Sequence, residues 1–238
     1  MNTSTSSTNF GLAFVDAVVA PTALFKSYQN MNRHGHFLLL GILLVAFFSQ
    51  YFFFSSMSDE HLLNQQLSHT SELNQSELAA VKELMKKNLP FTGIFVGAMQ
   101  SAIILLQILL LSALALVVAK TKSKKSISNY REALALVSWC HIPIVVCALG
   151  LVLLTMTAAS PDLPLSVVNY ASLNELILHL DKTHDLQDWA KSLSIFDFWI
   201  IALLTVGFKI KLSLSTVSSF ALAAIPFIAF YGVWFLMA

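Results

Sequence analysis

The feature that most constrains this chain is the length of its uncharged apolar runs. The stretch from Phe91 to Ala119 contains no Asp, Glu, Lys or Arg. A helix needs about 20 consecutive apolar residues to cross the hydrocarbon core of a bilayer, and this stretch exceeds that length. In lipid a helix also satisfies its own backbone hydrogen bonds without water. The run therefore predicts a membrane-spanning helix.

Further segments have the same apolar character. They are Phe37–Phe54, Glu132–Ala158, Leu193–Phe208 and Thr216–Ala238. Charged residues make up 11% of the chain, whereas typical soluble domains contain about 25%, as expected if much of the surface faces lipid. We predict an all-α polytopic membrane protein with five transmembrane helices, an N-terminal interfacial helix and amphipathic helices in the two outer loops.

The positions of the basic residues predict the orientation. The loop after the second predicted span carries Lys120, Lys122, Lys124, Lys125 and Arg131. Cytoplasmic loops are enriched in Lys and Arg. With this loop inside, the inner segments hold most of the 14 basic residues. We therefore expect a multi-pass protein of a cell inner (plasma) membrane with a cytoplasmic N-terminus and the C-terminus outside.

The N-terminal segment, residues 1–36, is predicted to be cytoplasmic, and residues 37–238 are predicted to form the five-helix transmembrane domain. Phe10, Phe14 and Val18 recur at helical spacing before Pro21 interrupts the pattern. Because this stretch is too short and too interrupted to span, it indicates a helix lying in the membrane interface. The alternative is a cytoplasmic segment that packs on the bundle.

The two outer loops each contain an amphipathic pattern. In Ser55–Pro90 a helix is expected to start at Asn74 or Ser76. In Ala159–Ser192 the residues Ser172-Leu173-Asn174-Glu175 match a capping box, in which the first and last side chains satisfy each other's backbone amides. We expect these helices to lie on the membrane surface or to cap the bundle from outside.

Small and polar residues in the second predicted span indicate how it meets its neighbours. Gly93 and Gly97 form a G-x-x-x-G pattern, which Ser101 extends by one turn. Such patterns let helices approach closely in membranes. Gln100 and Gln107 share a helix face and need hydrogen-bond partners away from lipid.

The third predicted span carries His141 near the middle of the bilayer. At about 1.5 Å per residue it lies roughly 15 Å beyond Arg131. Pro143 in this span and Pro226 in the fifth each free a backbone carbonyl. We hypothesise that Gln107, His141 and the freed carbonyls face one another. His141 is either a proton relay or ligand contact, or a neutral histidine bonded to a neighbouring helix. The second role is favoured, because no charged group accompanies it at this depth.

Further candidates lie toward the outside. Asp197 is expected to cap its helix or to pair with Lys191, and lining a cavity is the functional alternative. His179, His184 and Asp185 are weak zinc candidates, because their spacing matches no strong metal motif.

The sequence contains no motif for nucleotide binding, zinc-dependent proteolysis or serine hydrolysis. A net charge of +1 provides no basic field for nucleic acid. We expect a protein without enzyme activity, cofactor or nucleic-acid partner. The expected partners are the lipid bilayer and either other membrane proteins or a second copy of the chain.

The chain resembles the Yip family (Ypt/Rab-interacting-protein family), in its bacterial form, over residues 15–236. The resemblance is carried by Pro21-Thr22-Ala23-Leu24-Phe25, by Tyr130-Arg131-Glu132-Ala133-Leu134 leading to Trp139 and Pro143, and by Phe196-Asp197-Phe198-Trp199 followed by Gly207. It implies a five-span fold with a cytoplasmic N-terminus and no catalytic residues. Eukaryotic relatives act in vesicle traffic and contact small GTPases through a longer N-terminal region than the one present here.

The first functional hypothesis is a non-enzymatic Yip-type membrane protein that binds partners or organises membrane. The alternative is a transporter or channel for a small solute or ion, with His141 and Gln107 in its path. A third is a metal sensor in the outer loop. A continuous polar cavity through the bundle would favour the transporter, and a tightly packed dry interior would favour the first hypothesis.

Overall fold

The computed structural model describes residues 9–27, 31–67, 75–121, 127–181 and 183–237. These residues form helices joined by loops, and Ser172 and Ser194 make an isolated antiparallel bridge. The longer helices are α3 (Met31–Ser56), α6 (Thr92–Lys120), α7 (Tyr130–Cys140), α8 (Ile142–Thr157), α10 (Ile195–Lys211) and α11 (Thr216–Met237). The shorter ones are α1 (Phe10–Val19), α2 (Pro21–Ser27), α4 (Asp59–Leu67), α5 (Gln75–Asn88), η1 (Leu89–Phe91), η2 (Leu165–Asn169), η3 (Asn174–Leu178) and α9 (Gln187–Ser192).

Four helical segments among the described residues are long and apolar enough to cross a membrane. They are α3, the segment Ala79–Lys120 that ends in α6, the segment Tyr130–Thr157 formed by α7 and α8, and α11. The prediction of an all-α, multi-pass membrane protein is therefore confirmed. Helix α10 has 17 residues, or about 25 Å at 1.5 Å per residue, which is shorter than a hydrocarbon core of about 30 Å.

The predicted span Glu132–Ala158 is long enough to cross, but its prediction as one continuous helix is wrong. Helices α7 and α8 meet at His141, whose backbone has φ −93° and ψ 9°. Pro143 has no amide hydrogen, so regular helical bonding cannot continue through this point. The His141 amide instead donates to the Ser138 carbonyl, and the Ile144 amide donates to the His141 carbonyl, both at 3.0 Å.

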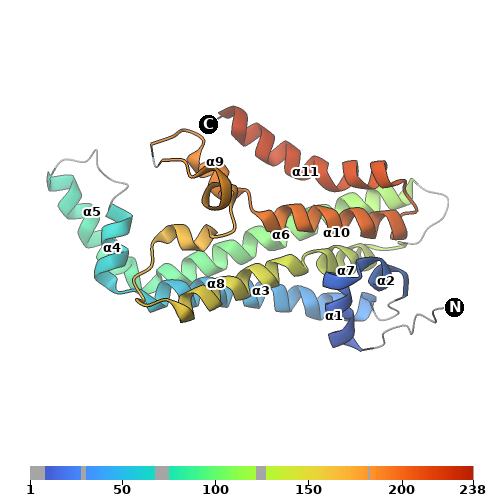
Figure 1. The fold of residues 1–238 in the computed structure, drawn as a ribbon, viewed down its shortest axis with the longest axis horizontal. Coiled ribbons are helices and arrows are strands. Elements are labelled where there is room, and N and C mark those ends of the chain that lie inside the picture. Colours follow the sequence, from blue (N-terminus) through green and yellow to red (C-terminus); the bar gives the residue numbers. More distant parts are fainter. Residues whose placement is uncertain (1–8, 28–30, 68–74, 122–126, 182, 238) are drawn as a thin grey trace.

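The long helices run side by side and fall into two groups (Figure 1). Helix α3 packs against α6, α7 and α8, while α10 packs against α11, α2 and α7. Helices α1 and α2 lie at one end of the bundle, and α4 and α5 lie at the other (Figure 1). The two groups meet through the contacts of α10 with α7 and α8.

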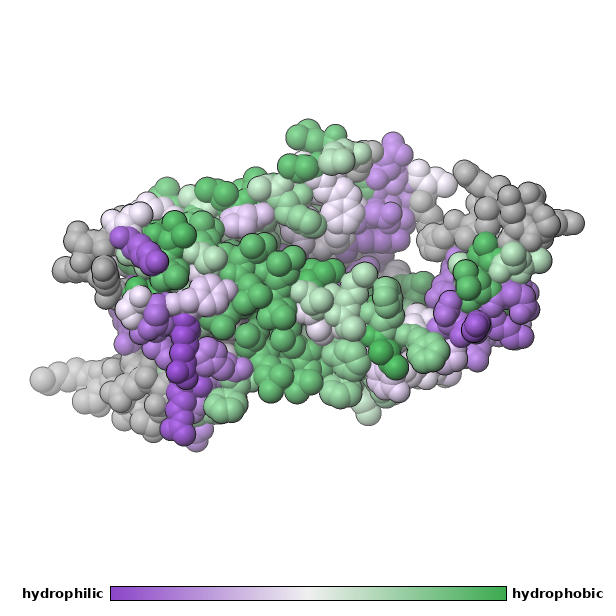
Figure 2. All heavy atoms as spheres, turned by 180° about the vertical axis from the view of Figure 1, so that it is seen from behind, coloured by the Kyte–Doolittle hydropathy of each residue, from purple (hydrophilic) through white to green (hydrophobic). Residues whose placement is uncertain are grey.

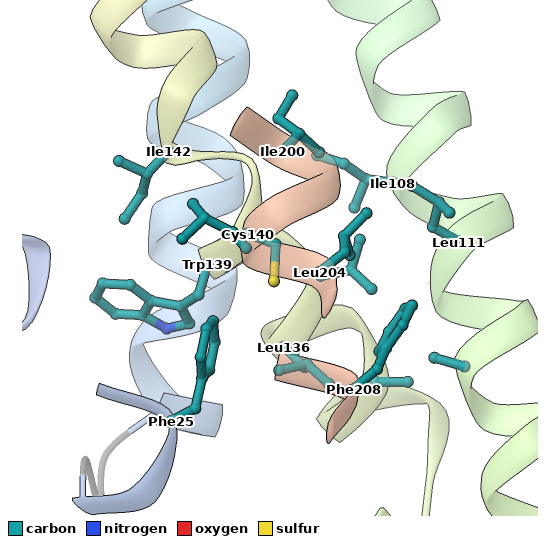
Figure 3. Packing of buried hydrophobic residues seen from close by; sticks show 14 of the residues in the cluster. Phe25, Ile108, Leu111, Leu136, Trp139, Cys140, Ile142, Ile200, Leu204 and Phe208 are labelled. Atoms are coloured by element: carbon teal, nitrogen blue, oxygen red, sulfur yellow. The ribbon is translucent and has the colours of Figure 1, made fainter. Parts of the chain in front are cut away.

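A hydrophobic core fills the half of the bundle nearer α1 and α2. Trp139 is fully buried in this core and lies next to Phe25 of α2 (Figure 3), and Leu136 of α7 belongs to the same cluster. Phe208 and Leu204 of α10 close the other side. A smaller cluster at the opposite end contains Phe53, Met57, Leu62, Leu63, Leu89 and Leu151.

The N-terminal helices belong to this core. Ala13 and Ala17 of α1 and Leu24 and Phe25 of α2 are buried. The break between the two helices falls at Ala20, and Pro21 begins α2, where its missing amide hydrogen costs nothing. The predicted division at residue 36 stays a prediction, but residues on both sides of it share one core.

Many large hydrophobic side chains are exposed on the surface, as expected for a protein that faces lipid. On the face shown in Figure 2, hydrophobic residues cover the middle and most hydrophilic residues gather toward the two ends. Phe37, Leu110 and Ile228, from three different helices, are 68%, 63% and 65% exposed. Soluble monomers rarely expose so continuous an apolar surface. The natural environment of this surface is the hydrocarbon core of a membrane.

The loop at 57–90 contains α4 and α5, and α5 begins at Gln75 within the predicted region. The predicted start at Asn74 and the terminal Ala238 of the last predicted span lie outside the described residues. At the second predicted start the Ser172 hydroxyl accepts a hydrogen bond from the Glu175 amide at 3.2 Å. The helix that follows is the single π-helical turn η3, which ends because His179 adopts a left-handed conformation with φ 48°.

Candidate functional site

A cleft of about 620 Å³ lies between the two groups of helices. One wall comes from α3, α6 and α8, and the other comes from α9, α10 and α11. Cavities of about 300–1,000 Å³ are typical of small-molecule sites. The polar side chains that line it include Ser49, Gln50, Gln100, Gln107, Asn169, Asp188, Lys191, Asp197 and Tyr231.

The hydrophobic core borders the inner end of the cleft. Ile104 and Ile200 line the cleft and also belong to the buried cluster around Trp139. On the far side of this cluster lies a separate hollow of about 70 Å³ between Glu132 and Lys211. The polar lining therefore occupies one half of the bundle, and packed apolar side chains fill the other.

Gln50 is the buried polar group of the α3 wall. It is 9% exposed, and its Oε1 atom has no hydrogen-bond partner among the described residues. A buried acceptor left without a partner costs about 1–3 kcal/mol. Gln50 lines the cleft, so a donor placed there can satisfy this oxygen.

Gln100 and Gln107 of α6 line the same cleft as Gln50. Gln100 is exposed and Gln107 is half-buried. Their shared face therefore looks into the cleft. The structure gathers three glutamines there, of which Gln50 was not anticipated.

His141 does not line the cleft that these glutamines share, and its ring bonds the Val137 carbonyl, whereas the hypothesis joined it to Gln107. The histidine is fully buried. Its Nδ1 atom lies 2.8 Å from the Val137 carbonyl in its own helical segment. That carbonyl is available because the His141 amide bonds Ser138 instead. The ring thus replaces a backbone donor lost at the break, while its Nε2 atom has no partner among the described residues.

Asp197 fixes the start of α10 and also lines the cleft. Its carboxylate accepts a hydrogen bond from the Ser194 amide at 2.9 Å, completing a capping box. The Tyr231 hydroxyl of α11 lies 3.1 Å from the same oxygen and 3.2 Å from the Ser192 carbonyl. Trp189 donates to the Tyr231 carbonyl at 2.9 Å. These bonds tie α9, α10 and α11 into one wall.

Gly93 and Gly97 face α3. A Cβ atom at Gly97 would lie 2.7 Å from the Phe47 carbonyl oxygen, and one at Gly93 would lie 3.1 Å from that of Tyr51. The Ser101 hydroxyl donates to the Leu43 carbonyl at 3.0 Å. The three residues form the α3–α6 contact beside the cleft.

The family of the chain follows from one comparison. A family model described as the Yip1 domain matches residues 16–237. This chain belongs to the Yip1 family. The comparisons with curated proteins and with solved structures found no match.

In this Yip1 family protein, segments that carry the resemblance meet in the core. Phe25 and Trp139 pack together there, and the Trp139 indole donates to the Met31 carbonyl at 3.3 Å. A Cβ at Gly207 would lie 3.1 Å from Leu136 and 3.3 Å from the sulfur of Cys140. These positions therefore hold the fold together, and they lie outside the cleft lining.

The remaining candidates lie elsewhere in the Yip1 family protein. Pro226 sits inside α11 without breaking it, and Pro143 stands in the first turn of α8. His184 bonds the Leu186 amide through Nδ1, whereas His179 ends η3. Among the described residues no three His, Cys, Asp or Glu side chains come together as a metal site, and His179, His184 and Asp185 form no cluster.

The sequence carried a weak signal for Gln50. Gln50 stands next to Ser49 in an otherwise apolar run, and that polar pair was the available sign of its role. Tyr170, which contacts the lining residue Cys147 but does not itself line the cleft, gave no comparable signal. Its hydroxyl donates to the Cys147 carbonyl at 3.1 Å, and its ring fills the space left by Gly150.

Proposed function

We propose that this Yip1 family protein is a non-enzymatic membrane protein that acts by binding a partner within or beside the bilayer and so organises the membrane around it. The observation that carries the proposal is the polar cleft that the hydrophobic core borders. It offers buried polar groups such as Gln50 to a ligand, and the core around Trp139 closes the way to the other side.

The proposal includes five spans, with α10 as the fourth in chain order. Helix α10 is short for a bilayer, but Lys209 and Lys211 stand at its last turn. Long basic side chains reach the interface from such positions. The distribution of basic residues supports a cytoplasmic N-terminus, a C-terminus outside and placement in a cell inner membrane.

Helix α1 supports contact with the membrane surface. It packs on the bundle through Ala13 and Ala17, while Leu12, Val15 and Val19 are 58%, 54% and 77% exposed. An exposed apolar face beside the end of a membrane bundle favours insertion among the lipid head groups. Packing on the bundle and lying in the interface are thus compatible for this helix.

The transporter hypothesis requires a polar route through the molecule. Gln107 lines the cleft, but His141 does not, and the core lies between the cleft and the smaller hollow. The metal-sensor hypothesis requires His179, His184 and Asp185 to converge, which they do not. Among the described residues, the position of Gln107 is the one feature that fits a transporter, and no metal-ligand set for a sensor comes together.

Two measurements on the full-length protein test the proposal. Purification in mild detergent after chemical crosslinking in membranes is expected to recover a defined partner. Reconstituted vesicles are expected to hold ion gradients as well as protein-free vesicles do. A specific ion leak from these vesicles would contradict the proposal and favour a channel.

A further inference from the structure

We infer that the cleft binds a phospholipid, with the phosphate at Lys191 and a hydroxyl or amine hydrogen-bond donor of the head group at Gln50. The lipid comes from the leaflet at the α9 end of the bundle. This inference rests on the proposed function and names the chemical class of the partner.

The rim of the cleft faces lipid. Ile103 of α6 and Phe230 of α11 line opposite sides and are 55% and 62% exposed. Helix α11 packs on α10 and α9, and it runs beside α9 toward the C-terminus (Figure 1). Apolar side chains on both sides of the rim suit the acyl chains of a lipid that enters the cleft laterally from the bilayer.

The polar interior requires a hydrogen-bond donor. The Oε1 atom of Gln50 is an acceptor without a partner among the described residues. The Asp197 carboxylate already receives the Ser194 amide and lies beside the Tyr231 hydroxyl. A ligand N–H or O–H is therefore needed at Gln50 more than at Asp197. Ethanolamine and glycerol head groups carry such donors, whereas choline does not.

The charges at the mouth fit a phosphodiester. Lys191 of α9 is half-buried and lines the cleft, and an ammonium binds phosphate as a point charge. Asp188, one turn earlier on the same helix, is exposed and lines the cleft as well. Its carboxylate disfavours head groups with several negative charges and suits an amine or hydroxyl next to the phosphate.

The test uses the full-length protein in vesicles that contain equal amounts of phosphatidylethanolamine, phosphatidylglycerol and phosphatidylcholine. The protein is extracted in mild detergent, and the co-purified lipids are measured by mass spectrometry. The wild type is expected to retain one of the two donor-bearing lipids over phosphatidylcholine by roughly three- to tenfold, the ratio that one net hydrogen bond supplies.

Two variants probe the two contacts separately. Gln50→Leu is expected to abolish the preference over phosphatidylcholine. Lys191→Gln is expected to lower retention of all three lipids severalfold, and its thermal unfolding in detergent should match that of the wild type. Gln66→Leu in α4 and Lys209→Gln at the far end of α10 are matched changes outside the cleft, and both should behave as wild type.

Three results would overturn the inference. They are equal retention of the three lipids by the wild type, unchanged retention in Lys191→Gln, and displacement of the lipid by water-soluble glycerophosphoethanolamine at matched concentration. The last result would assign the cleft to a soluble phosphodiester. Recovery of a protein partner without retained lipid overturns this inference alone, and an ion leak contradicts the proposed function alone.

Discussion

Gly97 brings α6 against α3 because it carries no side chain. The Phe47 carbonyl and ring occupy the space that a side chain at this position would need. Gly41 of α3 offers the opposite case, since a Cβ there meets nothing within 4 Å. Substitutions at these two glycines therefore distinguish the effect of close packing from the effect of helix propensity.

Gly97→Ala should lower the stability of the protein by about 1–3 kcal/mol, because the methyl group forces α6 away from α3. Gly41→Ala should keep or slightly raise stability, because alanine favours a helix over glycine. Thermal unfolding in detergent measures both. Equal behaviour of the two variants would show that the α3–α6 approach does not depend on Gly97.

His141→Phe should retain the fold, with a change in stability within about 1.5 kcal/mol. The phenyl ring fills the same buried space and removes the partnerless Nε2, at the expense of the bond to Val137. His141→Ala should cost more, about 2–4 kcal/mol, because it leaves a cavity. Unfolding in detergent measures stability, and lipid retention by His141→Phe should equal that of the wild type. Loss of retention in a stable His141→Phe would show that the histidine has a functional role.

Some residue contacts could be predicted from the sequence and others could not. The spacing of Gly93 and Gly97 indicates a contact face whatever the partner helix is. The role of Gln50 depends on which helices stand opposite it, and α9 and α11 come far later in the chain. Tyr170 reaches Gly150 because its loop folds back into the bundle, which no local pattern encodes.

At the scale of elements, the loop before α6 and the loop after α8 contact each other beside α4. The Asp162 carboxylate accepts hydrogen bonds from the Ser58 amide at 2.8 Å and from its hydroxyl at 3.0 Å. The Gln65 amide group donates to the Leu163 carbonyl at 2.9 Å and accepts from the Leu165 amide at 2.8 Å. These bonds hold α4 to the segment that follows α8.

This contact should weaken in acid. The hydrogen bonds from Ser58, first from its backbone amide and then from its hydroxyl, lower the pKa of Asp162. A lowered pKa in the folded state means that the contact contributes stability above the unfolded pKa of about 4 and loses it as the pH falls through the folded pKa. Hydrogen-exchange protection of the Ser58 amide should be present at neutral pH and fall in strong acid.

Asp162→Asn provides the control for this pH effect. The amide keeps one acceptor but cannot ionise, so protection of Ser58 should be lower at neutral pH and independent of acid. A wild-type protection factor that stays constant down to about pH 2 would contradict the link between this carboxylate and the loops.

The helix boundaries show where sequence patterns suffice. Spans α6 and α11 follow their apolar runs almost to the residue, because lipid selects for composition along the whole helix. The break at His141 was missed, since a proline is tolerated in a membrane helix when neighbouring groups take up the freed bonds. The helix predicted from the capping box at Ser172 is the short π-helical turn η3, because the left-handed conformation of His179 ends it.

At the scale of the whole molecule, a membrane-impermeant maleimide tests the proposed orientation. Ser160→Cys, in the exposed loop after α8, should be labelled in intact cells, and Thr121→Cys, exposed at the end of α6, should not. Both should be labelled after permeabilisation. The parent protein sets the background, since Cys140 is buried and Cys147 half-buried. Labelling of Thr121→Cys from outside would invert the topology.

The packing of α2 on α10 has a consequence for biosynthesis. Phe25 is buried against residues near Gly207, which a ribosome adds long after the first helices have left its tunnel. Until then Phe25 can pack beside Trp139 of α7, but the side of its ring that meets α10 has no partner there. The packing around Phe25 is therefore complete only once α10 has been synthesised and inserted, so an early segment waits for a late helix.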